Sequence, residues 1–113
     1  TFLSGKFKLI DVSSFDTSKV IDMNRLFSAH TYIYGYEKLN TGQATDMGGM
    51  FTGVLNENLD LSSFDITNTS NIKNMFNGCK SKIGYAKDEE TALKFNDSSV
   101  TKIPSTLVFT VKQ

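Results

Sequence analysis

Residues 13–27 read Ser-Ser-Phe-Asp-Thr-Ser-Lys-Val-Ile-Asp-Met-Asn-Arg-Leu-Phe, and the part that begins at Phe15 recurs twice further along the chain. Residues 39–51 read LNTGQATDMGGMF, and residues 64–76 read FDITNTSNIKNMF. The three copies start at residues 15, 39 and 64, so they lie 24 and then 25 residues apart. Self-similarity at such a period is the sequence signature of a repeat protein.

Aligning the three copies brings apolar residues into common columns. The columns are Ile10/Tyr34/Leu59, Val12/Tyr36/Leu61, Phe15/Leu39/Phe64, Met23/Met47/Ile72, Leu26/Met50/Met75 and Phe27/Phe51/Phe76. The first two columns are two residues apart, which is typical of a strand with one buried face. The last three have the spacing of one buried stripe on a short helix. We therefore expect all six columns, including Tyr34 and Tyr36, to form the core.

This pattern predicts an α/β repeat fold, a leucine-rich-repeat-like solenoid of about three strand-plus-short-helix units of 24–25 residues each. The expected repeats are 9–32, 33–57 and 58–83, followed by a C-terminal helix–strand cap over 84–113, all within a single domain 1–113. The sheet should be parallel because consecutive units run the same way. In the cap, the spacing predicts a helix that Asp88 caps and a strand over 106–111.

Composition excludes several classes of function. The chain has 113 residues, and its 12 basic and 12 acidic side chains give a net charge of zero. That balance argues against binding to nucleic acid or to an anionic membrane surface. A single cysteine, Cys79, excludes a disulfide within the chain and a cysteine-based metal site. No apolar run reaches the roughly 18 residues of a membrane span, so we expect no direct membrane insertion by this fragment.

Catalytic and metal-binding alternatives carry little weight in this sequence. The only histidine, His30, could be imagined in a Ser–His–Asp arrangement, but Ser and Asp are so abundant that a triad means nothing without geometry. The columns Asp16/Asn40/Asp65 and Asp22/Asp46/Asn71 could line up oxygen ligands for calcium, but the glycine-rich nonapeptide of calcium-binding β-rolls is absent, and Asp and Asn that satisfy turn backbones explain the columns better. We expect no catalytic residue, no metal and no cofactor.

One surface is a candidate for partner binding. In a strand whose Ile10 and Val12 point inward, Asp11 and Ser13 point outward. Their counterparts in the later copies are Gly35, Glu37, Asp60 and Ser62. This strip is acidic and small-sided, which suits a basic or hydroxyl-rich partner met weakly and many times over. The alternative is that these small polar residues serve only solubility.

The motif at 13–27 resembles the repeat of the BspA-like bacterial surface proteins, which is also found in mycoplasma lipoproteins and in cell-wall proteins of low-GC Gram-positive bacteria. The chain departs from that repeat at Gly42-Gln43-Ala44 and at Asn68-Thr69-Ser70. The ending Gly84-Tyr85-Ala86-Lys87, an acidic helix and then Pro104-Ser105-x-Leu107-x-Phe109 resembles the closing segment of such arrays. The resemblance covers roughly residues 9–111.

The resemblance implies an extracellular, repeat-built module with no catalytic residues to transfer. Members of that group are often described as adhesins or surface antigens. We therefore expect a non-catalytic cell-surface module for adhesion or host and matrix binding, whose partner is a protein or glycan. Its anchor would lie outside this fragment, since the chain begins with Thr1 and resembles a piece of a longer protein. The alternative function is a structural spacer with no ligand of its own.

Overall fold

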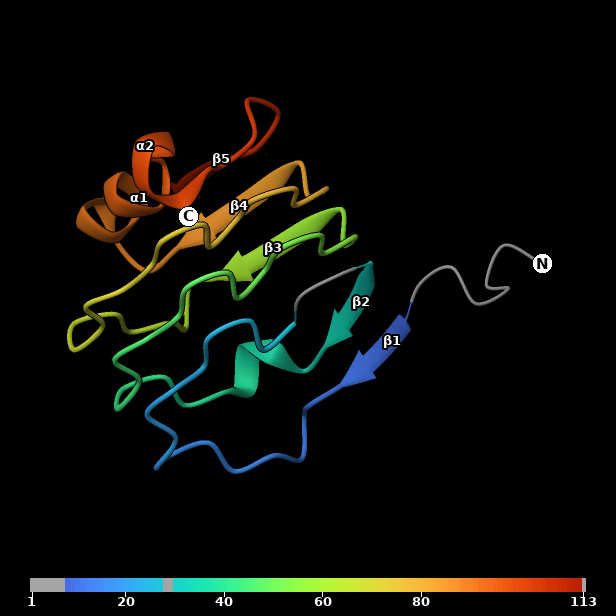
Figure 1. Ribbon diagram of the computed structural model, residues 1–113, viewed down its shortest axis with the longest axis vertical. Helices are drawn as coiled ribbons and strands as arrows, with labels where there is room; N and C mark the ends of the chain where they lie inside the picture. The colour runs from blue at the N-terminus through green and yellow to red at the C-terminus, as the bar shows by residue number, and fades with distance from the viewer. Residues whose placement is uncertain (1–7, 28–29, 113) are drawn as a thin grey trace.

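Short parallel strands and polar turns make up most of the molecule (Figure 1). The computed structural model describes residues 8–27 and 30–112. In chain order its elements are β1 (Lys8–Asp11), β2 (Thr31–Tyr34), the 3₁₀-helix η1 (Tyr36–Lys38), β3 (Asn58–Leu61), β4 (Ile83–Ala86), α1 (Glu89–Phe95), α2 (Ser98–Thr101) and β5 (Val108–Val111). The polar loops between the strands run back across the far side of the core.

The strands form two small sheets. β1 and β2 pair in parallel, with Lys8 opposite Thr31. β3, β4 and β5 form the second sheet, also parallel, in which Asn58, Ile83 and Val108 lie opposite one another. The predicted parallel orientation of neighbouring strands is therefore confirmed.

Side chains join the two sheets in place of a continuous backbone ladder, beside one backbone bridge in which the Leu55 N–H donates to the Thr31 carbonyl at 2.8 Å. The Asn56 amide bonds both backbone groups of Ile33, accepting from its N–H at 2.9 Å and donating to its carbonyl at 2.9 Å. The hydroxyl of Tyr36 accepts the N–H of Asp60 at 2.9 Å. A polar side chain thus occupies the place of the neighbouring strand at each of these points. This insertion interrupts the sheet between β2 and β3.

The segments expected to be short helices are turns. The backbone N–H groups of Met23, Arg25 and Phe27 donate sideways to the carbonyls of Asp46, Gly48 and Met50 at 2.8–3.1 Å. Backbone N–H groups that donate to another segment cannot also form the i to i−4 hydrogen bonds of a helix. Positive φ angles of 58°, 62° and 59° at Arg25, Gly49 and Asn74 interrupt a helical course as well.

The predicted solenoid of strand-plus-short-helix units is therefore wrong. The structure is a small compact body with two separate sheets, measuring 41 × 32 × 27 Å with a radius of gyration of 13.1 Å, as expected for a globular chain of this length. Its two α-helices both lie after residue 88, in the C-terminal part of the chain. Lateral backbone bonding between the turns replaced the helices that the apolar spacing suggested.

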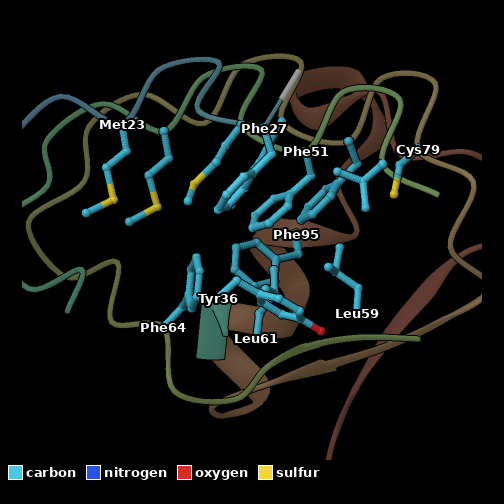
Figure 2. Packing of buried hydrophobic residues seen from close by; sticks show 14 of the residues in the cluster. Met23, Phe27, Tyr36, Phe51, Leu59, Leu61, Phe64, Cys79 and Phe95 are labelled. Carbon is cyan, nitrogen blue, oxygen red and sulfur yellow. The ribbon is translucent and has the colours of Figure 1, made fainter. Parts of the chain in front are cut away.

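The core lies between the turns on one side and the strands on the other. In Figure 2, Met23, Phe27 and Phe51 project from the turns toward Leu61 and Phe64 on the strand side. The rings of Phe27 and Phe76 lie 5.7 Å and 5.9 Å from that of Phe51. The predicted burial of the column Phe27/Phe51/Phe76 is confirmed, because each is at most 1% exposed.

Three residues of the predicted core, Phe15, Leu26 and Tyr34, are on the surface. Phe15 is 61% exposed and Leu26 is 43% exposed, although their counterparts Phe64 and Met75 are fully buried. The later copies have packed neighbours on both sides. Among the residues that the structure places, Phe15 has no such neighbouring copy packed on its outer side.

The C-terminal prediction holds in part. Asp88 caps α1 as expected, since its carboxylate accepts the N–H of Thr91 at 2.8 Å. The strand is shorter than the predicted span 106–111, beginning at Val108. Asn96 bonds both backbone groups of Phe109, at 2.8 Å and 2.9 Å, and so ties α1 to β5. The short helix α2, which Asp97 caps, was not predicted.

Candidate functional site

The strands lie next to one another along one side of the molecule (Figure 1). Side chains alternate along each strand, so that residues on either side of a buried one face outward. We call the outward set the outer sheet face. Its members are Leu9, Asp11, Tyr32, Tyr34, Asn58, Asp60, Ile83, Tyr85, Val108 and Thr110.

This face is more apolar than the sequence suggested. Leu9, Tyr34, Ile83 and Val108 are 64%, 53%, 44% and 58% exposed, and all four lie on it. The expectation of an acidic, small-sided strip is therefore wrong. Exposed apolar side chains gathered on one face mark an interaction surface more often than scattered ones do.

A one-residue shift in register explains why Tyr34 lies on this face. The sequence alignment placed Tyr34 opposite Ile10, but in the structure Ile10 lies opposite Ile33, and Tyr34 lies opposite Asp11. Tyr34 therefore points outward and its predicted burial is wrong, because a shift of one residue moves a strand's side chains to the other face. Tyr36 is buried as expected, but from η1 and not from a strand.

The predicted binding residues divide into two groups. Asp11 and Asp60 lie on the outer sheet face, each directly before a turn whose serine bonds it. Ser13 and Ser62 are those turn serines.

Gly35 and Glu37 belong to the connection between β2 and the next segment. Gly35 has a positive φ of 77°, and a Cβ there would come within 2.5 Å of Ser13, so its role is close backbone packing. Glu37 is exposed in η1, and its carbonyl accepts the Ser63 hydroxyl at 2.8 Å.

Asp60 stands at the centre of a polar cluster on this face. Its Oδ1 accepts the N–H and the hydroxyl of Ser62 at 3.0 Å and 2.6 Å, and its Oδ2 accepts the Lys112 ammonium at 2.8 Å. The Lys112 Nζ also lies 5.7 Å from the centre of the Tyr85 ring. Partial burial raises the pKa of Asp60, but hydrogen bonds from Lys112 and Ser62 outweigh it, so the net pKa lies below its usual value.

Neither Tyr85, which the sequence marked only as part of a closing segment, nor Lys112 was a predicted binding residue. Tyr85 follows the glycine of β4, and its outward position could have been found by counting from Leu59 and Leu61 across the sheet. Lys112 lies 52 residues from Asp60 along the chain, so no local spacing signals their contact.

The Asp and Asn columns act as turn formers, as predicted. Asp16, Asn40 and Asp65 each accept the N–H of the second residue after them, at 2.9–3.0 Å. Asp22, Asp46 and Asn71 do the same at 2.8–2.9 Å. Asp46 also accepts the amides of Asn24 and Asn71 at 3.0 Å and 3.1 Å. Hydrogen bonds from Asn24 and from the Gly48 backbone hold the pKa of Asp46 below its usual value.

The remaining candidates show no shared geometry. His30 is exposed, and Cys79 is buried, which raises the pKa of its thiol. Within residues 8–27 and 30–112, no group of three or more His, Cys, Asp or Glu side chains could hold a metal ion. In the same ranges no helix is both long and apolar enough to cross a bilayer.

Comparison with known proteins gives one match. No curated protein and no solved structure is significantly similar to the chain. The family model described as "Mycoplasma protein of unknown function, DUF285" matches residues 2–108, which is nearly the whole sequence. The chain therefore belongs to this Mycoplasma family of unknown function.

Proposed function

We propose that the chain is a non-catalytic interaction module of a longer bacterial surface protein, and that it binds its partner through the outer sheet face. The observation that carries this proposal is the placement of Leu9, Tyr34, Ile83 and Val108, all at least 44% exposed, on that one face. The sequence resemblance to BspA-like surface proteins supports an extracellular location and a role in adhesion. The partner would be a protein or glycan of the host or its matrix.

The spacer alternative is less consistent with this surface. A rod that only holds another domain away from the cell needs solubility, which polar side chains provide. Large exposed apolar side chains on a single face reduce solubility, so their presence there favours contact with a partner. The other exposed large apolar residues lie away from this face and are divided between the loop after β1 and the two C-terminal helices: Phe15, Ile21 and Leu26 in the loop, Leu93 on α1 and Val100 on α2.

The test compares two triple alanine variants with the wild-type chain. One variant changes Leu9, Tyr34 and Val108 on the outer sheet face, and the matched control changes Ile21, Leu93 and Val100, which are also exposed. Each protein is coupled to beads and applied to cultured host cells and to an array of matrix proteins and glycans. Circular dichroism checks that both variants fold.

We expect the outer-face variant to lose at least about tenfold in attachment, as when central apolar contacts of an interface are truncated. The control variant should bind like wild type. Equal binding by the outer-face variant and wild type would contradict the proposal. The spacer function predicts no attachment by any of the three proteins.

A further inference from the structure

The outer sheet face carries the same pair of residues twice. Asp11 lies directly opposite Tyr34 across β1 and β2. Asp60 lies directly opposite Tyr85 across β3 and β4. In both pairs the aspartate is on the earlier strand and the tyrosine on the next one, and both side chains point away from the core.

The two aspartates are oriented by the same local contact. Asp11 Oδ1 accepts the N–H of Ser13 at 3.0 Å, and Asp60 Oδ1 accepts the N–H of Ser62 at 3.0 Å. This contact engages one carboxylate oxygen and leaves Oδ2 as the acceptor for another group. The hydrogen bond from the Ser13 backbone also lowers the pKa of Asp11, so its carboxylate is charged at neutral pH.

The molecule itself shows what one of these pairs binds. The Lys112 ammonium donates to Asp60 Oδ2 at 2.8 Å and lies 5.7 Å from the Tyr85 ring centre. A cation near the face of an aromatic ring is attracted by the ring quadrupole, and the carboxylate adds a charged hydrogen bond. The pair of Asp60 and Tyr85 is thus occupied by a lysine of the same chain.

The pair of Asp11 and Tyr34 has no such occupant among the residues that the structure places. Lys112–Asp60 is the one ion pair among the side chains that the structure describes, in 9–27 and 30–112. The charge of Lys38 lowers the pKa of the Asp11 carboxyl, but only as the smallest of four effects. Tyr34 is 53% exposed, so its ring is open to a ligand.

From this equivalence we propose that Asp11 and Tyr34 bind the ammonium group of a lysine side chain on a protein partner. A lysine fits better than an arginine, because only one carboxylate oxygen remains available and a guanidinium binds best through two. The inference rests on the proposed function, since it names the chemistry that the outer sheet face recognises. Lys112 then serves as a built-in competitor that closes the second pair.

The test is an NMR titration of the ¹⁵N-labelled chain with the capped peptide acetyl-Gly-Lys-Gly-amide. The control peptide carries an Nε-acetylated lysine, which removes the charge and keeps most of the shape. We expect the lysine peptide to shift the amide signals of Ser13 and Tyr34, and the acetylated peptide to leave them in place. Equal shifts with both peptides would overturn the proposal.

Three variants make the test specific. D11N keeps the bond to Ser13 but removes the charge, and Y34L removes the ring. Each should weaken binding by about two- to fivefold, as expected for exposed ion pairs and cation–π contacts. K112A should open a second site, seen as new shifts at Ser62 and Tyr85. Unchanged affinity in D11N and Y34L, or no second site in K112A, would overturn the inference.

The outcome separates this inference from the proposed function. Attachment to a partner that depends on Leu9, Tyr34 and Val108 but not on Asp11 would leave the interaction role intact and show that its chemistry is not lysine recognition. The same conclusion would follow if added glycans reduced attachment and the added lysine peptide did not.

Discussion

At the C-terminal end of the core, α1 packs against β4 and β5, and the ring of Phe76 lies 5.4 Å from that of Phe95 and 4.7 Å from that of Phe109. At the other end, Phe15 and Leu26 border an apolar hollow of about 380 Å³ that Val12, Val20, Met23 and Leu39 also line. The two ends contain the same kinds of turn and the same residue columns. They differ in what covers them.

This contrast shows that burial in the molecule follows from neighbours and not from residue type. Phe15 and Phe64 occupy the same column, as do Leu26 and Met75, yet only the later member of each pair is fully buried. A large apolar residue stabilises the fold in proportion to the surface it removes from water. The same substitution should therefore have different effects at the two ends.

Phe51 joins the two ends, so its loss should have the largest effect. Its ring lies within 6.5 Å of the rings of Phe27, Tyr36, Phe64 and Phe76, and it is fully buried. Phe51→Ala should lower the free energy of unfolding by about 3–5 kcal/mol, the cost of an enclosed cavity. Urea unfolding measures this change. A midpoint equal to that of wild type would show that Phe51 does not hold the ends together.

Matched residues at the two ends give the direct comparison. Met75→Ala should lower the free energy of unfolding by about 2–4 kcal/mol, since Met75 is fully buried near the covered end. Leu26→Ala should cost less than about 1 kcal/mol, because Leu26 is 43% exposed at the open end. Urea unfolding of both variants provides the measurement. Equal losses would mean that the open end is covered in solution.

Substitutions in the polar turns should also lower the free energy of unfolding less at the open end, and by smaller amounts than core substitutions do. Among the residues that the structure describes, Asp46 accepts three hydrogen bonds, from Asn24, Gly48 and Asn71, whereas Asp22 accepts one, from the backbone of Asn24. Asp46→Ala should cost about 1 kcal/mol, reduced from the sum of three bonds because solvent reaches the carboxylate. Asp22→Ala should cost roughly half as much or less. Thermal unfolding compares the two variants, and a larger loss for Asp22→Ala would contradict this expectation.

Acid should lower the stability of the fold at both ends alike, and by less than the substitutions above. The pKa values of Asp16 at the open end, of Asp65 near the covered end and of Asp46 between them all lie below the usual value. A lowered pKa contributes stability above the unfolded-state pKa of about 3.9, and this contribution is lost as pH falls through the folded-state pKa. The urea concentration at the unfolding midpoint should therefore decrease as the pH is lowered from about 4 to about 2.

Asp46→Asn provides the control for the acid experiment. It removes one of the titrating carboxylates, so the midpoint of this variant should depend less on pH than that of wild type. A midpoint that stays constant in wild type from pH 7 to pH 2 would show that these carboxylates do not stabilise the fold.

Patterns in the sequence predicted local structure well. The cap of α1 at Asp88 followed from a spacing of a few residues, whereas the apolar column Phe27/Phe51/Phe76 and the turn-forming Asp and Asn columns followed from the repeat of 24–25 residues. Of the outer sheet face, Asp11 and Asp60 were identified. Tyr34 was misplaced because the strand register between β1 and β2 is 23 residues, from Lys8 to Thr31, while the turns repeat at 24.

The amino-acid sequence alone determined which residues could be buried and which could close a turn, because these choices depend on side-chain chemistry and on partners two to four residues away. Only the tertiary structure decided whether the N–H groups of the turns donate to carbonyls of their own helix or to carbonyls of the neighbouring turn. Either arrangement satisfies the same donors. The tertiary structure also decided which end of the core is covered and which lysine reaches Asp60. Those outcomes depend on contacts between residues more than 20 positions apart, as between Met23 and Asp46 or Lys112 and Asp60, and no local pattern encodes them.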